Sequence, residues 1–197
     1  MTAFDALPPV PAATLDRLHA RLAVAAADAD LVDVAYRILP SPVGDLLLAA
    51  TPAGLVRIAF SVQDHDAVLA GLAGTISPRV LRAPARLDAA ARELDEYFAG
   101  RRRSFDLPLD LRLAQGFRRS VLDALPGIGY GSTASYAAVA RLAGSPAAVR
   151  AVGTACARNP LPLVIPCHRV VRSDGTPGQY AGGPTAKQTL LTLETPA

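Results

Sequence analysis

The side chains best suited to chemistry in this sequence lie together, in the segment Pro166-Cys167-His168-Arg169. A thiol beside an imidazole and a guanidinium is in an electropositive setting, which lowers the pKa of a cysteine and raises its fraction of thiolate. A thiolate is a soft nucleophile that attacks saturated carbon or an acyl group. The pattern indicates a nucleophile at Cys167, although a buried structural cysteine has the same local sequence.

Cys156 is the only other cysteine in the sequence. Two cysteines make neither a disulfide framework nor a zinc site of four thiolates, and two free thiols are typical of a cytoplasmic protein. We therefore expect no metal site, no organic cofactor and a cytoplasmic location. Cys156 lies among small residues, so we interpret it as a packing residue.

The segments around Cys167 predict the elements that position it. The apolar run Leu161–Ile165, bounded by Pro160 and Pro166, predicts a short buried extended segment. Upstream, apolar periodicity predicts helices over 115–125, 133–142 and 147–157, the last with Ser145 as its N-cap and Pro146 at its first position. Two short helices joined by a glycine-containing turn are typical of a helix-turn-helix unit.

The last of these helices is unusual because Arg150 is almost its only long side chain. A helix that reads the major groove normally offers several Arg, Asn or Gln side chains to base edges. A face of small residues instead allows close approach to a narrow groove. An alanine-rich core helix has the same pattern, so both interpretations stay open.

The first half of the chain has a different pattern. Alternating residues predict strands over 32–38, 46–50 and 55–60, the last two forming a hairpin, and periodic residues predict helices over 64–72 and 87–98. A further helix is expected within residues 1–30, with Thr14 as its N-cap. We therefore predict an α/β (α+β) chain in three parts: an N-terminal extension (1–30), a small sheet-and-helix domain (31–108) and a mainly helical domain (109–197).

The charge is distributed unevenly between the halves. The chain has 197 residues and a net charge of +3, but residues 1–98 carry 8 basic and 12 acidic side chains, whereas residues 99–197 carry 12 and 5. The basic half fits a polyanionic partner, and chance variation along a chain fits the same count. The run Arg101–Arg103 is either a solvated loop or a phosphate contact.

Composition excludes several classes of protein. A hydrophobic content of 51% with 19% charged residues argues against disorder. The sequence has no run of 18 apolar residues and no pattern of a secretion signal at its start, so we expect neither a membrane-spanning helix nor export.

The run Asn159–Val171, NPLPLVIPCHRVV, resembles the active-site signature of the O6-alkylguanine-DNA alkyltransferases, the methylated-DNA–protein-cysteine methyltransferases. Residues 131–136 (GSTASY) and 148–153 (AVRAVG) resemble that family's helix-turn-helix. Tyr180–Gly183 and the segment 187–194 resemble its closing loop and last helix. The resemblance covers residues 113–197 closely, and the N-terminal domain, which it implies to be RNase H-like, more loosely.

The resemblance implies a role for each matched residue. Cys167 would accept the alkyl group, His168 would deprotonate it through a water, Glu194 would orient His168, and Asn159 would position the cysteine loop. Tyr136 would crowd the phosphate of the target nucleotide and help it rotate.

The resemblance also implies the partner, which is double-stranded DNA containing O6-alkylguanine, bound through the minor groove by a monomer. Arg150 would fill the space left by the flipped base. The further DNA contacts would come from Ser135, Ala147, Ala151 and Gly153, and the base pocket from Val170, Tyr180, Ala181 and Gly182. Many relatives have Ser where this chain has Ala181, which leaves backbone donation to O6 intact and removes a hydroxyl. Because the sulfur–carbon bond formed does not hydrolyse in cells, each molecule would react once.

Three other functions compete with this one. A binder of alkylated DNA that performs no repair would lack the nucleophile, but Cys167 is present. A thiol-dependent transferase or hydrolase with another substrate would need neither the helix pair nor the basic half. A transcription regulator would need more base-reading side chains than the 147–157 helix offers.

Overall fold

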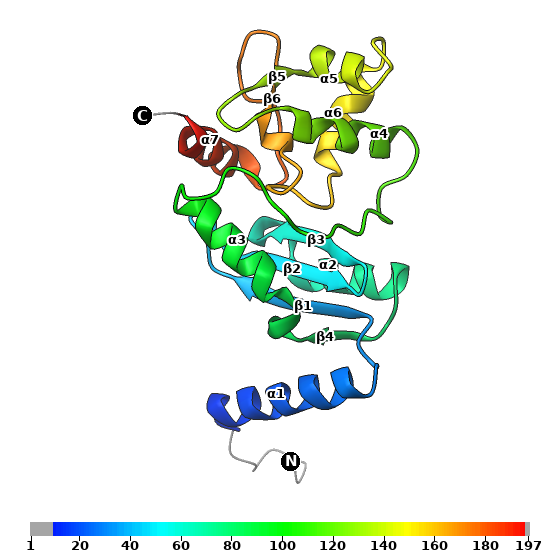
Figure 1. Cartoon of the computed structure of the whole chain (residues 1–197), viewed down its shortest axis with the longest axis vertical. Helices are drawn as coiled ribbons and strands as arrows, with labels where there is room; N and C mark the ends of the chain where they lie inside the picture. The colour runs from blue at the N-terminus through cyan, green and yellow to red at the C-terminus, as the bar shows by residue number, and fades with distance from the viewer. Residues whose placement is uncertain (1–9, 196–197) are drawn as a thin grey trace, which may run out of the picture.

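The computed structural model describes residues 10–195 and divides them into a sheet region and a helical region (Figure 1). The sheet contains β1 (Val34–Leu39), β2 (Leu46–Thr51), β3 (Gly54–Phe60) and β4 (Val80–Arg82) in the order β3-β2-β1-β4. β1, β2 and β3 pair antiparallel in sequence, and β4 pairs parallel with β1. This arrangement confirms the predicted hairpin and the mixed α/β fold class.

Helices cover both faces of the sheet. α3 (Asp88–Phe98) buries Leu94 and Tyr97 against one face, with Leu48 and Ile58 of the sheet in the same core. α2 (His65–Thr75) buries Leu72 with strand residues of the other face. Alternate strand residues point to opposite faces, so the nearly continuous apolar runs of β2 and β3 supply both cores.

The helical region follows the sheet in the chain. It contains α4 (Phe117–Ala124), α5 (Tyr136–Leu142), α6 (Val149–Ala157) and α7 (Gly183–Glu194), and α4, α5 and α6 pack against one another. Two short parallel strands, β5 (Ala134–Ser135) and β6 (Val170–Val171), join the start of α5 to the segment that follows Cys167. Neither β4, β5 nor β6 was expected, because two or three residues are too few for an alternating pattern.

The two regions share one core. Residues of β2, β3, α3, α4, α5, α6 and α7 belong to the same buried cluster. The backbone N–H of Ile58 in β3 donates to the Pro160 carbonyl at 2.8 Å, so the edge strand holds the start of the cysteine loop directly. The sheet region therefore supports the loop that carries Cys167.

α1 (Ala12–Asp28) lies apart at the β4 edge (Figure 1). It has no buried residue, and only Ala23 and Ala26 pack against a small core in the sheet region. Of the predicted extension, residues 1–9 lie outside the described part of the chain. No helix between residues 10 and 195 is long and apolar enough to cross a membrane.

Three local predictions are wrong. Residues Leu161–Ile165 are buried but form a turn, in which Ile165 N–H donates to the Leu161 carbonyl at 2.8 Å and Leu163 has φ +75°. Thr14 is not an N-cap because α1 begins at Ala12, after Pro11. Ser145 does not cap α6 and Pro146 is not its first residue, because Ser145–Ala148 form a tight turn, closed by Ala148 N–H donating to the Ser145 carbonyl, and α6 begins only at Val149.

Candidate active site

Cys167 begins the 3₁₀ turn Cys167–Arg169 and is 3% exposed. Asn159, just beyond α6, holds the loop that leads to it. The Asn159 amide nitrogen lies 2.8 Å from the Ile165 carbonyl oxygen and 3.1 Å from the Cys167 sulfur, and its oxygen accepts from Leu161 N–H at 3.0 Å. One amide therefore closes the turn and fixes the thiol. This network also explains why the apolar run is not extended.

Burial sets the protonation state of the thiol. Removal from water disfavours a thiolate, and this raises the pKa of Cys167 to about 11, although the Asn159 amide and the ammonium of Lys187 act in the opposite direction. At neutral pH the free protein therefore holds a thiol at this position. A nucleophile of this kind needs a base at the moment of reaction.

Glu194, the last residue of α7, is the centre of a second buried group. Its carboxylate accepts from Tyr97 Oη at 2.7 Å and from the Arg169 guanidinium at 2.8 and 2.9 Å, and lies 2.9 Å from His168 Nε2. Burial alone would raise the pKa of Glu194, but hydrogen bonds from His168 and Arg169 outweigh it and lower the pKa to about 2. Glu194 is therefore ionised and accepts hydrogen bonds only.

The ionised carboxylate fixes the tautomer of His168. Nε2 must carry the proton that bonds to Glu194, so in the neutral ring Nδ1 has the free lone pair. His168 is fully buried, and burial lowers its pKa despite the hydrogen bond to Glu194, so the ring is neutral at pH 7. Nδ1 is buried and has no hydrogen-bond partner among the described residues. The arrangement is that of a general base oriented by a carboxylate.

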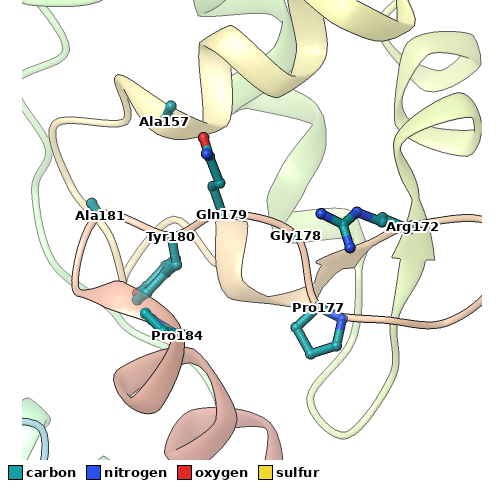
Figure 2. A pocket seen from close by; sticks show the side chains of 8 residues that line it. All are labelled: Ala157, Arg172, Pro177, Gly178, Gln179, Tyr180, Ala181 and Pro184. Carbon is teal, nitrogen blue, oxygen red and sulfur yellow. The ribbon is translucent and has the colours of Figure 1, made fainter.

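A cavity of about 510 Å³ opens beside this centre (Figure 2). The loop 177–181 forms one of its walls, and the end of α6 at Ala157 and the start of α7 close it. The Tyr180 ring connects the cavity to the reaction centre, since its centroid lies 6.3 Å from that of His168 and 5.4 Å from that of Phe60 in β3. The cavity is lined by Ala157, Arg172, Pro177, Gly178, Gln179, Tyr180, Ala181 and Pro184.

Two glycines let the loop pass close to aromatic rings. A Cβ at Gly178 would overlap the hydroxyl of Tyr136, and a Cβ at Gly182 would lie 2.7 Å from the Phe60 ring. Tyr136 is the first residue of α5, and Ser135 caps that helix by accepting from Ala138 N–H at 3.1 Å. Of the predicted pocket residues, Tyr180 and Ala181 line the cavity and Gly182 follows them against Phe60, while the predicted helix residue Tyr136 lies behind Gly178 of the cavity wall.

The predicted DNA contacts fall on a different surface. Arg150 and Ala151 in the first turn of α6, and Ala147 in the turn before it, are exposed. Gly153 is half-buried, and a Cβ there would be 3.9 Å from the Tyr136 ring. Val170 is fully buried. The catalytic candidates thus lie inside the helical region and the DNA candidates outside, with Tyr136 and Gly153 between them.

The arginines of the helical region divide into two sets. Arg118 donates to the Leu113 carbonyl, Arg119 pairs with Asp123 at 2.8 Å and Arg169 pairs with Glu194. The others are exposed and, among residues 10–195, have no acidic partner within 4.0 Å. These are Arg141, Arg150, Arg158 and Arg172.

Two family descriptions match the chain: "6-O-methylguanine DNA methyltransferase, ribonuclease-like domain" over residues 34–111 and "6-O-methylguanine DNA methyltransferase, DNA binding domain" over 116–196. A methylated-DNA–protein-cysteine methyltransferase of Mycolicibacterium paratuberculosis is 40% identical over 82% of this chain and 92% of its own length. The chain belongs to the 6-O-methylguanine DNA methyltransferase family.

Solved structures of the 6-O-methylguanine DNA methyltransferase family agree with this assignment. The O6-methylguanine methyltransferase of Mycobacterium tuberculosis matches with TM-score 0.72 and 36% identity, over 83% of this chain and 96% of its own. A crystal structure of Mycobacterium tuberculosis OGT in complex with DNA matches with TM-score 0.70 and 35% identity, over 81% of this chain and 92% of its own. α1 lies outside the two residue ranges, 34–111 and 116–196, that the family descriptions match.

Several residues at the site of this family member were missed from its sequence. The sequence places Arg169 in an electropositive setting around Cys167, but its side chain is buried and paired with Glu194. Lys187, the only lysine, is fully buried and donates to the Val170 carbonyl at 2.6 Å. Tyr97 and Phe60 come from the sheet region, and no local motif marks them. The position of Arg169 next to His168 is the one sequence feature that could have identified a missed residue.

Proposed function

We propose that this protein repairs DNA by transferring an alkyl group from O6 of guanine to the sulfur of Cys167. The observation that carries the proposal is the buried thiol of Cys167, which Asn159 holds. The next residue, the neutral His168, bonds through Nε2 to the ionised Glu194, which leaves Nδ1 to accept a proton. Family membership and the names of the relatives support the same reaction. The reaction would make this protein a methylated-DNA–protein-cysteine methyltransferase.

In the proposed reaction, His168 Nδ1 takes the thiol proton of Cys167 through a water. The sulfur then attacks the alkyl carbon, a sulfur–carbon bond forms and the carbon–O6 bond breaks. The electron pair of the broken bond stays on guanine, which takes up a proton, so atoms and charge balance. Because the thioether is stable to hydrolysis, each molecule reacts once. We expect the reaction to need no cofactor.

Substrate access would require the damaged base to leave the duplex, since the sulfur is buried and cannot reach a stacked base. We propose that α5 and α6 act as a helix-turn-helix whose small-residue face lies in the minor groove, and that Arg150 fills the space of the extruded base. This mode reads little sequence, which suits repair at any guanine. We expect a monomer acting where the DNA is, in the cytoplasm.

The flipped guanine would be recognised by backbone groups of the pocket. The carbonyls of Cys167 and Val170 would accept from its edge, and the N–H of Ala181 would donate to O6. The Val170 carbonyl already accepts from Lys187. A carbonyl oxygen has two lone pairs, so one remains for the base.

Intact mass measurement tests the function directly. The protein is incubated with a duplex oligonucleotide containing one O6-methylguanine, and we expect one added methyl group, located on Cys167 by peptide mapping. Cys167→Ala should show no added mass. Cys156→Ala is the matched control, because burial raises the pKa of Cys156 to about 12 and so keeps it a thiol, and this variant should react like the unaltered protein.

Two outcomes would contradict the proposal. An unchanged mass with guanine restored in the oligonucleotide would mean a turnover enzyme. An unchanged mass with the lesion intact and the oligonucleotide bound would mean a binding protein.

A further inference from the structure

Arg172 lies at the mouth of the cavity, directly after β6 (Figure 2). β5 and β6 pair in parallel register, Ala134 with Val170 and Ser135 with Val171. The next residues in that register are Tyr136 and Arg172, and neighbouring strands lie about 5 Å apart. Gly178 lines the cavity with Arg172 and lies against the hydroxyl of Tyr136. A cation and a phenol therefore flank the entrance through which a base must pass.

The guanidinium of Arg172 has free donor capacity. Its side chain is exposed and forms one long hydrogen bond, from Nη1 to Thr176 Oγ1 at 3.4 Å. Asp174, the nearest acid in the same loop, is occupied by Thr176, whose backbone N–H and hydroxyl donate to it at 2.9 and 2.7 Å. Most of the five N–H donors of an arginine are thus available to a ligand.

Electrostatics agree with this position. The charge of Arg172 acts on the hydroxyl of Tyr136, where it opposes the rise in pKa that burial causes. The same charge disfavours the protonated form of Lys187 and so contributes to its lowered pKa. Arg172 therefore projects a positive potential into the cavity entrance as well as toward solvent.

We infer that Arg172 binds the phosphodiester group of the extruded nucleotide. A base that rotates into the cavity carries its own phosphate to the rim, beside Tyr136. A guanidinium donates two parallel hydrogen bonds to a phosphate, which fixes orientation as well as charge. Arg172 would hold the backbone in the rotated state, whereas Arg150 would fill the vacated stack. This assignment rests on the proposed base-extrusion function.

A pairing experiment between one arginine and one phosphate tests the inference. Methyl transfer rates are measured on a duplex containing O6-methylguanine, and on duplexes in which the phosphate 5′ or 3′ of that nucleotide is a neutral methylphosphonate. We expect Arg172→Ala to slow transfer from the unmodified duplex on the order of tenfold, as for loss of a charge-assisted hydrogen bond. One of the two methylphosphonates should slow transfer by the unaltered protein to a similar extent. On that duplex, the Arg172→Ala variant should react at the same rate as the unaltered protein.

Three controls separate the possible results. Arg172→Lys should recover part of the duplex rate, Arg92→Ala, at an exposed side chain of α3, should change nothing, and Arg172→Ala should slow transfer from free O6-benzylguanine much less than transfer from the duplex. Equal slowing by Arg172→Ala on all three duplexes would overturn the inference, and so would a loss on the free base as large as that on the unmodified duplex. Failure of the unaltered protein to take up an alkyl group from any substrate would instead overturn the proposed function itself.

Discussion

Charged side chains are paired with one another in the interior of the helical region, whereas several arginines on its surface have no acidic partner in the described part of the chain. Inside, Glu194 is matched by Arg169, His168 and Tyr97, and these side chains are almost entirely removed from water. Outside, Arg141, Arg150, Arg158 and Arg172 are exposed without an acidic partner within 4.0 Å among residues 10–195. Balanced charge holds a geometry for chemistry, whereas unbalanced charge is available to a polyanion.

The sheet region makes the surface pattern more informative. Its exposed or half-buried arginines include four that pair with acids: Arg37 with Asp88, Arg79 with Asp33, Arg82 with Asp16, and Arg92 with Glu96. The net charges of −4 and +7 in the two halves of the sequence therefore reflect a structural difference: these surface arginines pair with acids in the sheet region, whereas four in the described helical region do not. Asp174, the exposed acid that follows β6, accepts hydrogen bonds from Thr176 and forms no ion pair with Arg172.

The largest effect on stability and on the transfer rate should follow from disrupting the buried ion pair of Glu194 and Arg169. Glu194→Gln leaves the Arg169 guanidinium buried without its counter-charge, which costs about 3–5 kcal/mol of unfolding free energy. It also removes the group that orients His168, so transfer from free O6-benzylguanine should slow by about 100-fold or more. Urea unfolding and single-turnover rates measure the two effects.

The exposed acid Asp174 supplies the comparison for that variant. Asp174→Asn removes one negative charge from the same region without touching the buried group, so both stability and free-base rate should stay close to those of the unaltered protein. A Glu194→Gln protein that reacts with the free base at the normal rate would show that the buried carboxylate has no part in catalysis.

A smaller and more selective effect should follow from changing the surface. Arg150→Ala should lower the transfer rate from duplex DNA by roughly 10- to 100-fold, since a residue that occupies the vacated stack offsets a cost of a few kcal/mol. The rate with free O6-benzylguanine should not change, because no base has to be extruded. Both rates are measured by loss of the Cys167 thiol, with Arg92→Ala as the surface control. Equal losses on the two substrates would place Arg150 in the interior machinery instead.

Sequence reasoning reached the parts of the site that are local in the chain. Asn159, Cys167 and His168 lie within one run, and the predicted helices around Arg150 exist with shifted starts. It failed where side chains distant in sequence decide the structure. The hydrogen bond of Tyr97 to Glu194 joins residues 97 positions apart, and the turn at Leu161–Ile165 depends on the amide of Asn159 and not on the apolar pattern. Burial also reversed the expected thiol pKa, since the neighbouring Arg169 is directed at Glu194 and not at sulfur.

The smallest predicted effect is a pH dependence that only the interior can produce. Burial lowers the pKa of His168 below its ordinary value of 6.5, so the base stays neutral through physiological pH and becomes protonated only in more acidic solution. The transfer rate should therefore be flat from pH 8 down to about 6.5 and fall less than tenfold by pH 5.5. Arginines keep their charge over this range, so surface binding adds no inflection, and profiles with duplex and with free base should have the same shape. An inflection above pH 7 on the free base would mean that His168 is not the base, and profiles of different shape would mean that a titrating group outside the interior takes part in DNA binding.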